Sequence, residues 1–129
     1  EAYNASGLAR SQLGDYQGAQ VDYTRAILFK KNYPDPYFNR GVAKYSVRDY
    51  KGAISDFGKA IKIGKKAKAL MDKGVVDKDR HLIFAKNSFE TVTFIGKAYY
   101  YRGKAKFEKN SRKSAYKDWD KAAEYGYRE

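Results

Sequence analysis

A residue pattern that recurs after 34 positions constrains the fold of this 129-residue chain more than any other feature. The first copy consists of Tyr3, Gly7, Ala9, Asp15, Tyr16, Gly18, Ala19, Asp22, Ala26 and Ile27. The second consists of Tyr37, Gly41, Ala43, Asp49, Tyr50, Gly52, Ala53, Asp56, Ala60 and Ile61. A third, partial copy consists of Tyr99, Gly103, Ala105, Ala115, Asp118, Trp119 and Ala122. A period of this length predicts a stack of repeated units that bury their apolar faces against one another.

Each copy also combines a small residue in its first half with an aromatic residue in its second half. These residues are Gly7, Gly41 and Gly103, and Tyr23, Phe57 and Trp119. Two helices pack closely where small side chains let the backbones approach, and a large side chain fills the remaining space. Asp15 and Asp49 lie where a second helix would begin and can cap its free N–H groups, and Asn110 and Ser111 take that place in the third copy. The pattern predicts an all-α fold of helical hairpins.

This pattern resembles the tetratricopeptide repeat (TPR), a helix–turn–helix unit. The resemblance implies a right-handed superhelical stack of antiparallel helix pairs, with repeats at residues 1–33, 34–64 and 96–129 of one domain, which we expect to be part of a larger protein. The proline usual near the end of the family's repeat is absent, and Pro34 and Pro36 instead precede the second repeat, where they favour a helix start. The run Asn39–Gly41 is similar to repeats common in bacterial members.

An insertion separates the second and third copies, because Gly41 and Gly103 are 62 residues apart, 28 more than one period. We place it at residues 65–95. Gly64 is predicted to cap the C-terminus of the second repeat's last helix, although residues 65–73 can prolong that helix. Gly74 then indicates a break.

The second half of the insertion predicts another helix start, because Asn87 and Glu90 have the spacing of a capping box. Two interpretations follow. In the first, the helix continues to about Phe107 and, at roughly 20 residues, projects beyond the stack. In the second, a short helix packs on the side of the stack, with a kink at residues 91–93 where two threonines flank a valine.

The sequence contains no recognised catalytic or metal-binding motif. The chain has no cysteine and one histidine, His81, which excludes the common His and Cys metal clusters. It has neither a phosphate-binding loop nor a nucleophile elbow. Its sequence therefore predicts no enzyme, no cofactor and no metal, and no apolar run approaches the roughly 20 residues of a membrane span.

The recurring aspartates receive a structural interpretation. Arg40 and Arg102 stand directly before the small glycine of their copies and are predicted to pair with Asp56 and Asp118. The first copy has serine there, so its aspartate is expected to lack such a partner. Buried carboxylates persist in proteins when they are paired.

In the TPR family the first helix of each repeat lines a concave groove, and the resemblance implies which residues line it here. They are Asn4, Leu8, Phe38, Asn39, Val42, Tyr45, Lys97, Tyr100, Lys104 and Phe107. The predicted groove is aromatic with a basic end. A subclass of the family clamps a partner's terminal carboxylate at five groove positions. Asn39 and Lys97 match it but Asn4, Leu8 and Tyr101 do not, so clamp function is not expected.

The charge of the chain is +12 and is unevenly distributed. Residues 64–113 carry 14 basic and 5 acidic side chains. This excess is either a solvated face or a surface for an acidic partner.

The expected function is a protein–protein interaction scaffold that binds a protein or peptide partner in the concave groove. The basic end of the groove favours an acidic partner. The first alternative is binding of nucleic acid or an acidic partner through residues 64–113, where tyrosines 99–101 and Phe107 offer rings for stacking; nucleic acid ranks below protein as a partner. The second alternative is self-assembly into a homo-oligomer through the exposed ends of a short stack.

Overall fold

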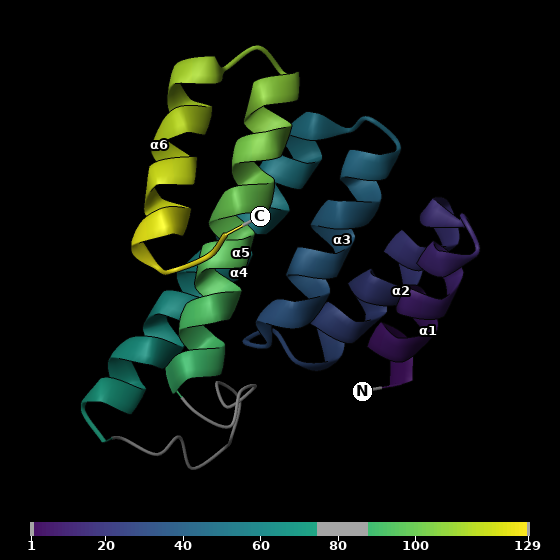
Figure 1. Ribbon diagram of the computed structural model, residues 1–129. Coiled ribbons are helices and arrows are strands. Elements are labelled where there is room, and N and C mark those ends of the chain that lie inside the picture. Colours follow the sequence, from purple (N-terminus) through teal and green to yellow (C-terminus); the bar gives the residue numbers. More distant parts are fainter. Residues whose placement is uncertain (1, 75–87, 129) are drawn as a thin grey trace.

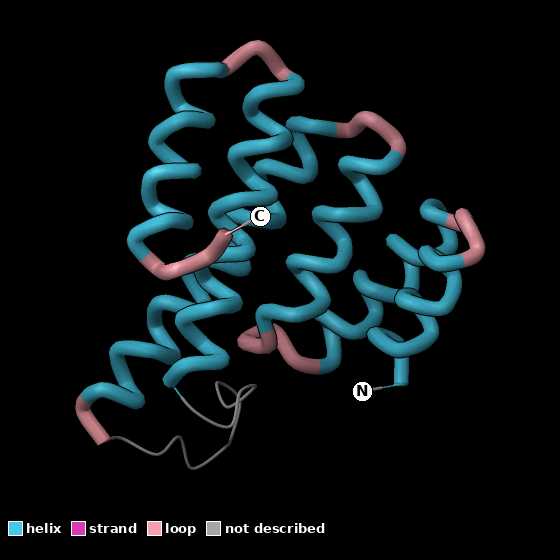
Figure 2. The backbone as a smooth tube through the Cα atoms, viewed as in Figure 1, coloured by secondary structure: helices cyan, strands magenta, loops and turns pink. Residues whose placement is uncertain are grey.

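The computed structural model describes residues 2–74 and 88–128, which form helices joined by short turns (Figures 1 and 2). The six helices are α1 (Ala2–Gln12), α2 (Tyr16–Phe29), α3 (Pro34–Ser46), α4 (Tyr50–Asp72), α5 (Ser88–Glu108) and α6 (Arg112–Glu124). No strand occurs in this part of the chain. The predicted all-α stack of helical hairpins is confirmed, and α3 begins at Pro34 as expected.

Each hairpin closes where a glycine of the first helix meets an aromatic ring of the second. A Cβ atom added at Gly41 would lie 2.7 Å from Cε1 of Phe57, so the glycine leaves space for that ring. The same contact joins Gly7 to Tyr23 and Gly103 to Trp119. The repeated glycines and aromatic residues therefore make the same packing contact in all three hairpins.

The turns between paired helices share a geometry. The carboxylates of Asp15 and Asp49 accept hydrogen bonds of 3.0 Å from the N–H groups of Gly18 and Gly52, which confirms both predicted caps. At the third turn the predicted side-chain cap is wrong. Ser111 is the N-cap residue of α6, but its side chain makes no capping hydrogen bond.

The predicted C-cap at Gly64 is also wrong, because α4 continues through it to Asp72. A Cβ atom on Gly64 would lie 3.0 Å from Cγ1 of Ile95, so this glycine allows α5 to approach α4 closely. The helix ends at Asp72 with Lys73 as its C-cap, and Gly74 follows with a φ of +70°, the left-handed conformation that favours glycine after a helix.

The first interpretation of the insertion is confirmed in its main point, since α5 is one helix of 21 residues from Ser88 to Glu108. It does not project alone, because the equally long α4 packs along it (Figure 1). Thr91 is fully buried at this contact, and its hydroxyl donates to Sδ of Met71 at 3.5 Å. About half of the expected insertion, residues 65–72 and 88–95, thus prolongs two paired helices. Asn87 and His81 lie outside the described residues.

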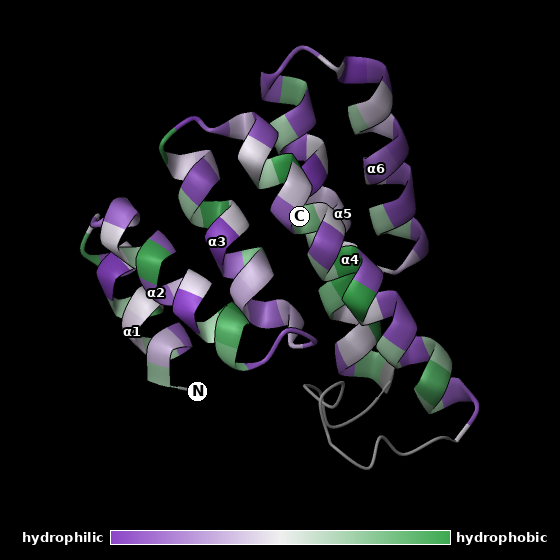
Figure 3. Ribbon diagram, turned by 180° about the vertical axis from the view of Figure 1, so that it is seen from behind, coloured by the Kyte–Doolittle hydropathy of each residue, from purple (hydrophilic) through white to green (hydrophobic). Residues whose placement is uncertain are grey.

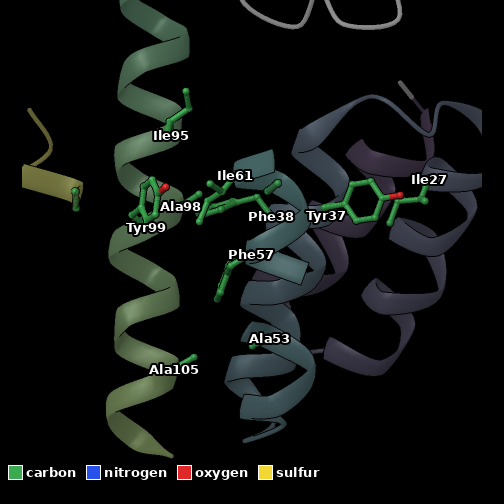
Figure 4. Packing of buried hydrophobic residues seen from close by; sticks show 12 residues of the cluster. Ile27, Tyr37, Phe38, Ala53, Phe57, Ile61, Ile95, Ala98, Tyr99 and Ala105 are labelled. Atoms are coloured by element: carbon green, nitrogen blue, oxygen red, sulfur yellow. The ribbon is translucent and has the colours of Figure 1, made fainter. Parts of the chain in front are cut away.

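The main core joins α3, α4 and α5 (Figure 4). The ring of Phe38 lies 5.5 Å from that of Phe57 and 5.3 Å from that of Tyr101. Ile95 and Ala98 of α5 pack against this aromatic group and are fully buried. Hydrophobic residues alternate with hydrophilic ones along every helix, as expected when each helix has one face in the core (Figure 3).

Candidate functional site

The three first helices of the hairpins lie side by side, since α3 contacts both α1 and α5 (Figure 1). We call the surface that these helices form together the first-helix face. Nδ2 of Asn39 donates to Oδ1 of Asn4 at 3.0 Å, which links the first two repeats across this face. Asn4 is only 8% exposed, so this bond lies at the base of the face.

A lysine surrounded by tyrosine rings is the main feature of the face. Nζ of Lys104 lies 5.6 Å from the ring centre of Tyr45, 5.7 Å from that of Tyr100 and 5.1 Å from that of Tyr101. The negative faces of aromatic rings attract a cation at such distances and hold the ammonium in place. Because Tyr45 belongs to α3 and the others to α5, this cluster spans two repeats. We call it the lysine–tyrosine cluster.

The surroundings of Tyr45, the member of the cluster that belongs to α3, raise the pKa of its hydroxyl. Burial raises the pKa of the Tyr45 hydroxyl above its ordinary value, and the nearby carboxylate of Glu108 adds to the rise. Tyr45 is therefore neutral at physiological pH and can donate or accept a hydrogen bond. In the same face, Nζ of Lys97 lies 5.0 Å above the ring of Phe38.

The predicted groove residues occupy different environments. Tyr45, Tyr100 and Lys104 come together in the cluster, and the ring of Phe107 packs 5.7 Å from that of Trp119. Phe38 is 6% exposed and serves mainly as core beneath Lys97. Leu8 is exposed, whereas Val42 and Asn39 are partly buried. Tyr101 was predicted only as a stacking ring of the nucleic-acid alternative and not as a groove residue, because the repeat pattern gives no aromatic residue at its position.

A second set of polar contacts lies between the helices of each hairpin. Arg40 donates from Nε and Nη2 to the two oxygens of Asp56, each at 2.8 Å, and Nζ of Lys44 lies 3.0 Å from the same carboxylate. Arg102 and Lys106 hold Asp118 in the same way, at distances of 2.7 to 2.9 Å. The predicted arginine pairs are thus present.

As expected, no arginine precedes the glycine of the first copy, but Asp22 has other partners. The hydroxyl of Ser6 donates to Asp22 at 2.8 Å, and Nε of Arg10 lies 3.3 Å from the same oxygen. Residues Arg10, Lys44 and Lys106 all stand twelve positions before their aspartates, a recurrence that could have revealed them.

Each of these carboxylates is paired with basic side chains of the chain itself, which argues for a structural role. Hydrogen bonding to the aspartate raises the pKa of Arg40 and of Arg102, and burial opposes the rise in each case. Among the described side chains, no group of three or more acidic or histidine residues is placed to hold a metal ion. Within residues 2–74 and 88–128, no helix is long and apolar enough to span a membrane.

Comparison with known proteins agrees with this architecture. A model of the TPR repeat family matches residues 7–47, about a third of the chain. The N-terminal domain of stress-induced protein-1 (STI-1) from C. elegans has a similar structure, with a TM-score of 0.73 and 17% identity over 96% of this chain and 81% of that one. The crystal structure of MamA aligns with a TM-score of 0.46 and 19% identity over 96% of this chain and 76% of that one. No curated protein matches.

The fold and the repeats define a TPR-type helical stack, and residues 7–47 match the TPR repeat family. Domains of this kind are in general non-catalytic scaffolds that bind protein partners. The fold therefore implies a protein–protein interaction module.

Proposed function

We propose that this chain binds an extended or helical segment of a partner protein on the first-helix face, in a concave groove lined by α1, α3 and α5. The observation that carries the proposal is the lysine–tyrosine cluster, which combines rigid aromatic area with a cation held in position. Tyrosine offers large contact area at little cost in conformational entropy, and such residues are enriched where binding energy concentrates.

The same cluster favours an acidic segment. Within the described chain the ammonium of Lys104 forms no ion pair with a carboxylate, so its charge is available to a partner. Lys97 adds a second cation on the same helix, seven residues before Lys104 and about two turns away. Two lysines above aromatic rings would orient a segment that carries carboxylates and would speed its association.

The test is capture from a nuclease-treated lysate at two salt concentrations, followed by identification of the bound protein and measurement of its affinity. The double variant Tyr45→Ala, Lys104→Ala removes one ring and the cation from the cluster. The control Tyr116→Ala, Lys117→Ala removes the same two residue types from exposed positions of α6. We expect the first variant to weaken binding about tenfold or more and the control to leave it unchanged.

Other outcomes of this experiment would overturn the proposal. Equal binding by both variants would place the contact outside the first-helix face. Capture that disappears with nuclease treatment would instead support the nucleic-acid alternative, which predicts a steep dependence on salt. Retention of only the chain itself would support self-assembly.

A further inference from the structure

The exposed side of α4 carries most of the unpaired positive charge of the second repeat. Its lysines are Lys51, Lys59, Lys62, Lys65, Lys66 and Lys73, and all of them are exposed. At 100° per residue these positions fall within one third of the helix circumference, together with Ser55 and Ala69. The stripe runs for about 33 Å at 1.5 Å per residue. We call it the α4 lysine face.

The repeat architecture does not require these lysines. At the equivalent positions of the first repeat, 34 residues earlier, Lys51, Lys62 and Lys66 are replaced by Gln17, Leu28 and Asn32, whereas Arg25 and Lys31 keep the charge of Lys59 and Lys65. Lys65 and Lys66 belong to the prolonged part of α4, beyond the length of α2, and Lys73 is the C-cap residue that follows it. The α4 lysine face is therefore more strongly charged than the equivalent side of the first repeat.

Neighbouring carboxylates do not neutralise the stripe. Among the described residues, no ion pair involves any of its six lysines, and the nearby Asp72 pairs with Lys68 at 2.6 Å. Lys59 lies 5.7 Å above the ring of Tyr37, which leaves its ammonium exposed. Unpaired charges of one sign on one face create a field that attracts an anionic surface.

Exposed apolar side chains adjoin the α4 lysine face. Leu28 and Phe29 at the end of α2 are 71% and 74% exposed, and Lys30 and Lys31 follow them. One recess is lined by residues 28–32, and a second by Asn32, Tyr37, Lys59, Lys62, Ile63 and Lys66. Because Asn32 lines both, the apolar pair and the lysines form one continuous surface.

We propose that this surface docks the chain on an anionic lipid bilayer, with the α4 lysine face against the headgroups and Leu28 and Phe29 inserted at the interface. Lysines beside exposed leucine and phenylalanine are the combination found in interfacial segments, where each lysine near the membrane adds electrostatic attraction. A protein partner fits less well, since lysine is depleted and arginine enriched in protein interfaces. Nucleic acid accounts for the lysines but gives the apolar pair no role.

Co-sedimentation with vesicles tests this proposal. The probes are vesicles of phosphatidylcholine alone and vesicles with about 30% phosphatidylserine, in about 0.1 M salt. We expect binding only to the anionic vesicles. Lys59→Gln, Lys62→Gln, Lys66→Gln should weaken it roughly a hundredfold, because each lysine near the surface adds about a fivefold factor. Leu28→Ser, Phe29→Ser should weaken it about tenfold or more.

The matched control is Lys109→Gln, Lys113→Gln, Lys117→Gln, which removes the same charge from exposed positions at and near the start of α6. We expect it to change binding by less than about threefold if position matters more than net charge. Circular dichroism would verify that all variants fold. Equal losses in both lysine variants, or no loss in the serine variant, would overturn the proposal. So would tighter binding of a DNA duplex than of anionic vesicles.

Discussion

Asp56 is the residue on which the second hairpin depends most for its polar contacts. It is almost fully buried and holds both Arg40 and Lys44, which are themselves mostly buried. Asp56→Asn removes the countercharge of both cations and should lower the free energy of unfolding by about 3 kcal/mol. Asp22→Asn should cost about 1 kcal/mol or less, because its partner Arg10 is 49% exposed and solvent screens that pair. Urea unfolding measures both, and equal losses would contradict this account.

Two helical glycines should respond oppositely to a methyl group. Gly41→Ala would force a shift of the buried ring of Phe57, 2.7 Å from the new Cβ, and should destabilise the chain by about 1–2 kcal/mol. At Gly58 the nearest side-chain atom would be Nη1 of Arg102 at 3.6 Å, so Gly58→Ala should stabilise by up to about 1 kcal/mol through helix propensity. Thermal unfolding of the two variants provides the comparison, and a gain at Gly41 would argue against close packing there.

Repetition explains which residues could be predicted. The glycine–aromatic contacts and the arginine–aspartate pairs recur at fixed spacing, so the sequence alone indicated them. The role of Ser6 was missed, because a hydroxyl replaces the arginine of the other copies, and the recurring cation of Arg10, Lys44 and Lys106 was not predicted either. The lysine–tyrosine cluster was only partly predicted, since it depends on contacts between helices that no periodicity encodes.

At the scale of the element, α4 and α5 are longer than the other helices and stabilise each other. Ala67 is 2% exposed, whereas Ala69, two residues later, is exposed. Ala67→Glu should place a carboxylate in the packed side of α4 and cost about 2–3 kcal/mol, while Ala69→Glu should cost little. Hydrogen exchange would detect the first change as lost protection of residues 65–72. Protection that stays intact would mean that α5 does not hold this segment.

The C-cap prediction at Gly64 was wrong because of a contact between two helices. A glycine followed by lysines reads as a helix end, because glycine favours the left-handed C-terminal conformation and lysines favour the negative end of the helix. A glycine that allows two helices to approach gives the same local sequence. Only the position of Ile95, which lies 31 residues away in the chain, distinguishes the two cases.

The whole molecule presents two surfaces of different character. The first-helix face offers aromatic rings and the cation of Lys104, and the exposed side of α4 offers lysines next to Leu28 and Phe29. The sequence predicted the fold class and the basic excess, but it located that excess at residues 64–113. The α4 lysine face begins earlier, at Lys51, because only the helix geometry brings lysines before and after Gly64 onto one side.

Site-specific crosslinking tests most directly whether the first-helix face is the binding surface. A photo-reactive phenylalanine derivative replaces Tyr45 in one variant and Tyr116, exposed on α6, in the other. Both variants are irradiated in nuclease-treated lysate, and the adducts are identified by mass spectrometry. Binding on the first-helix face should give a protein adduct from position 45 that is absent from position 116. Adducts from position 116 alone would contradict it.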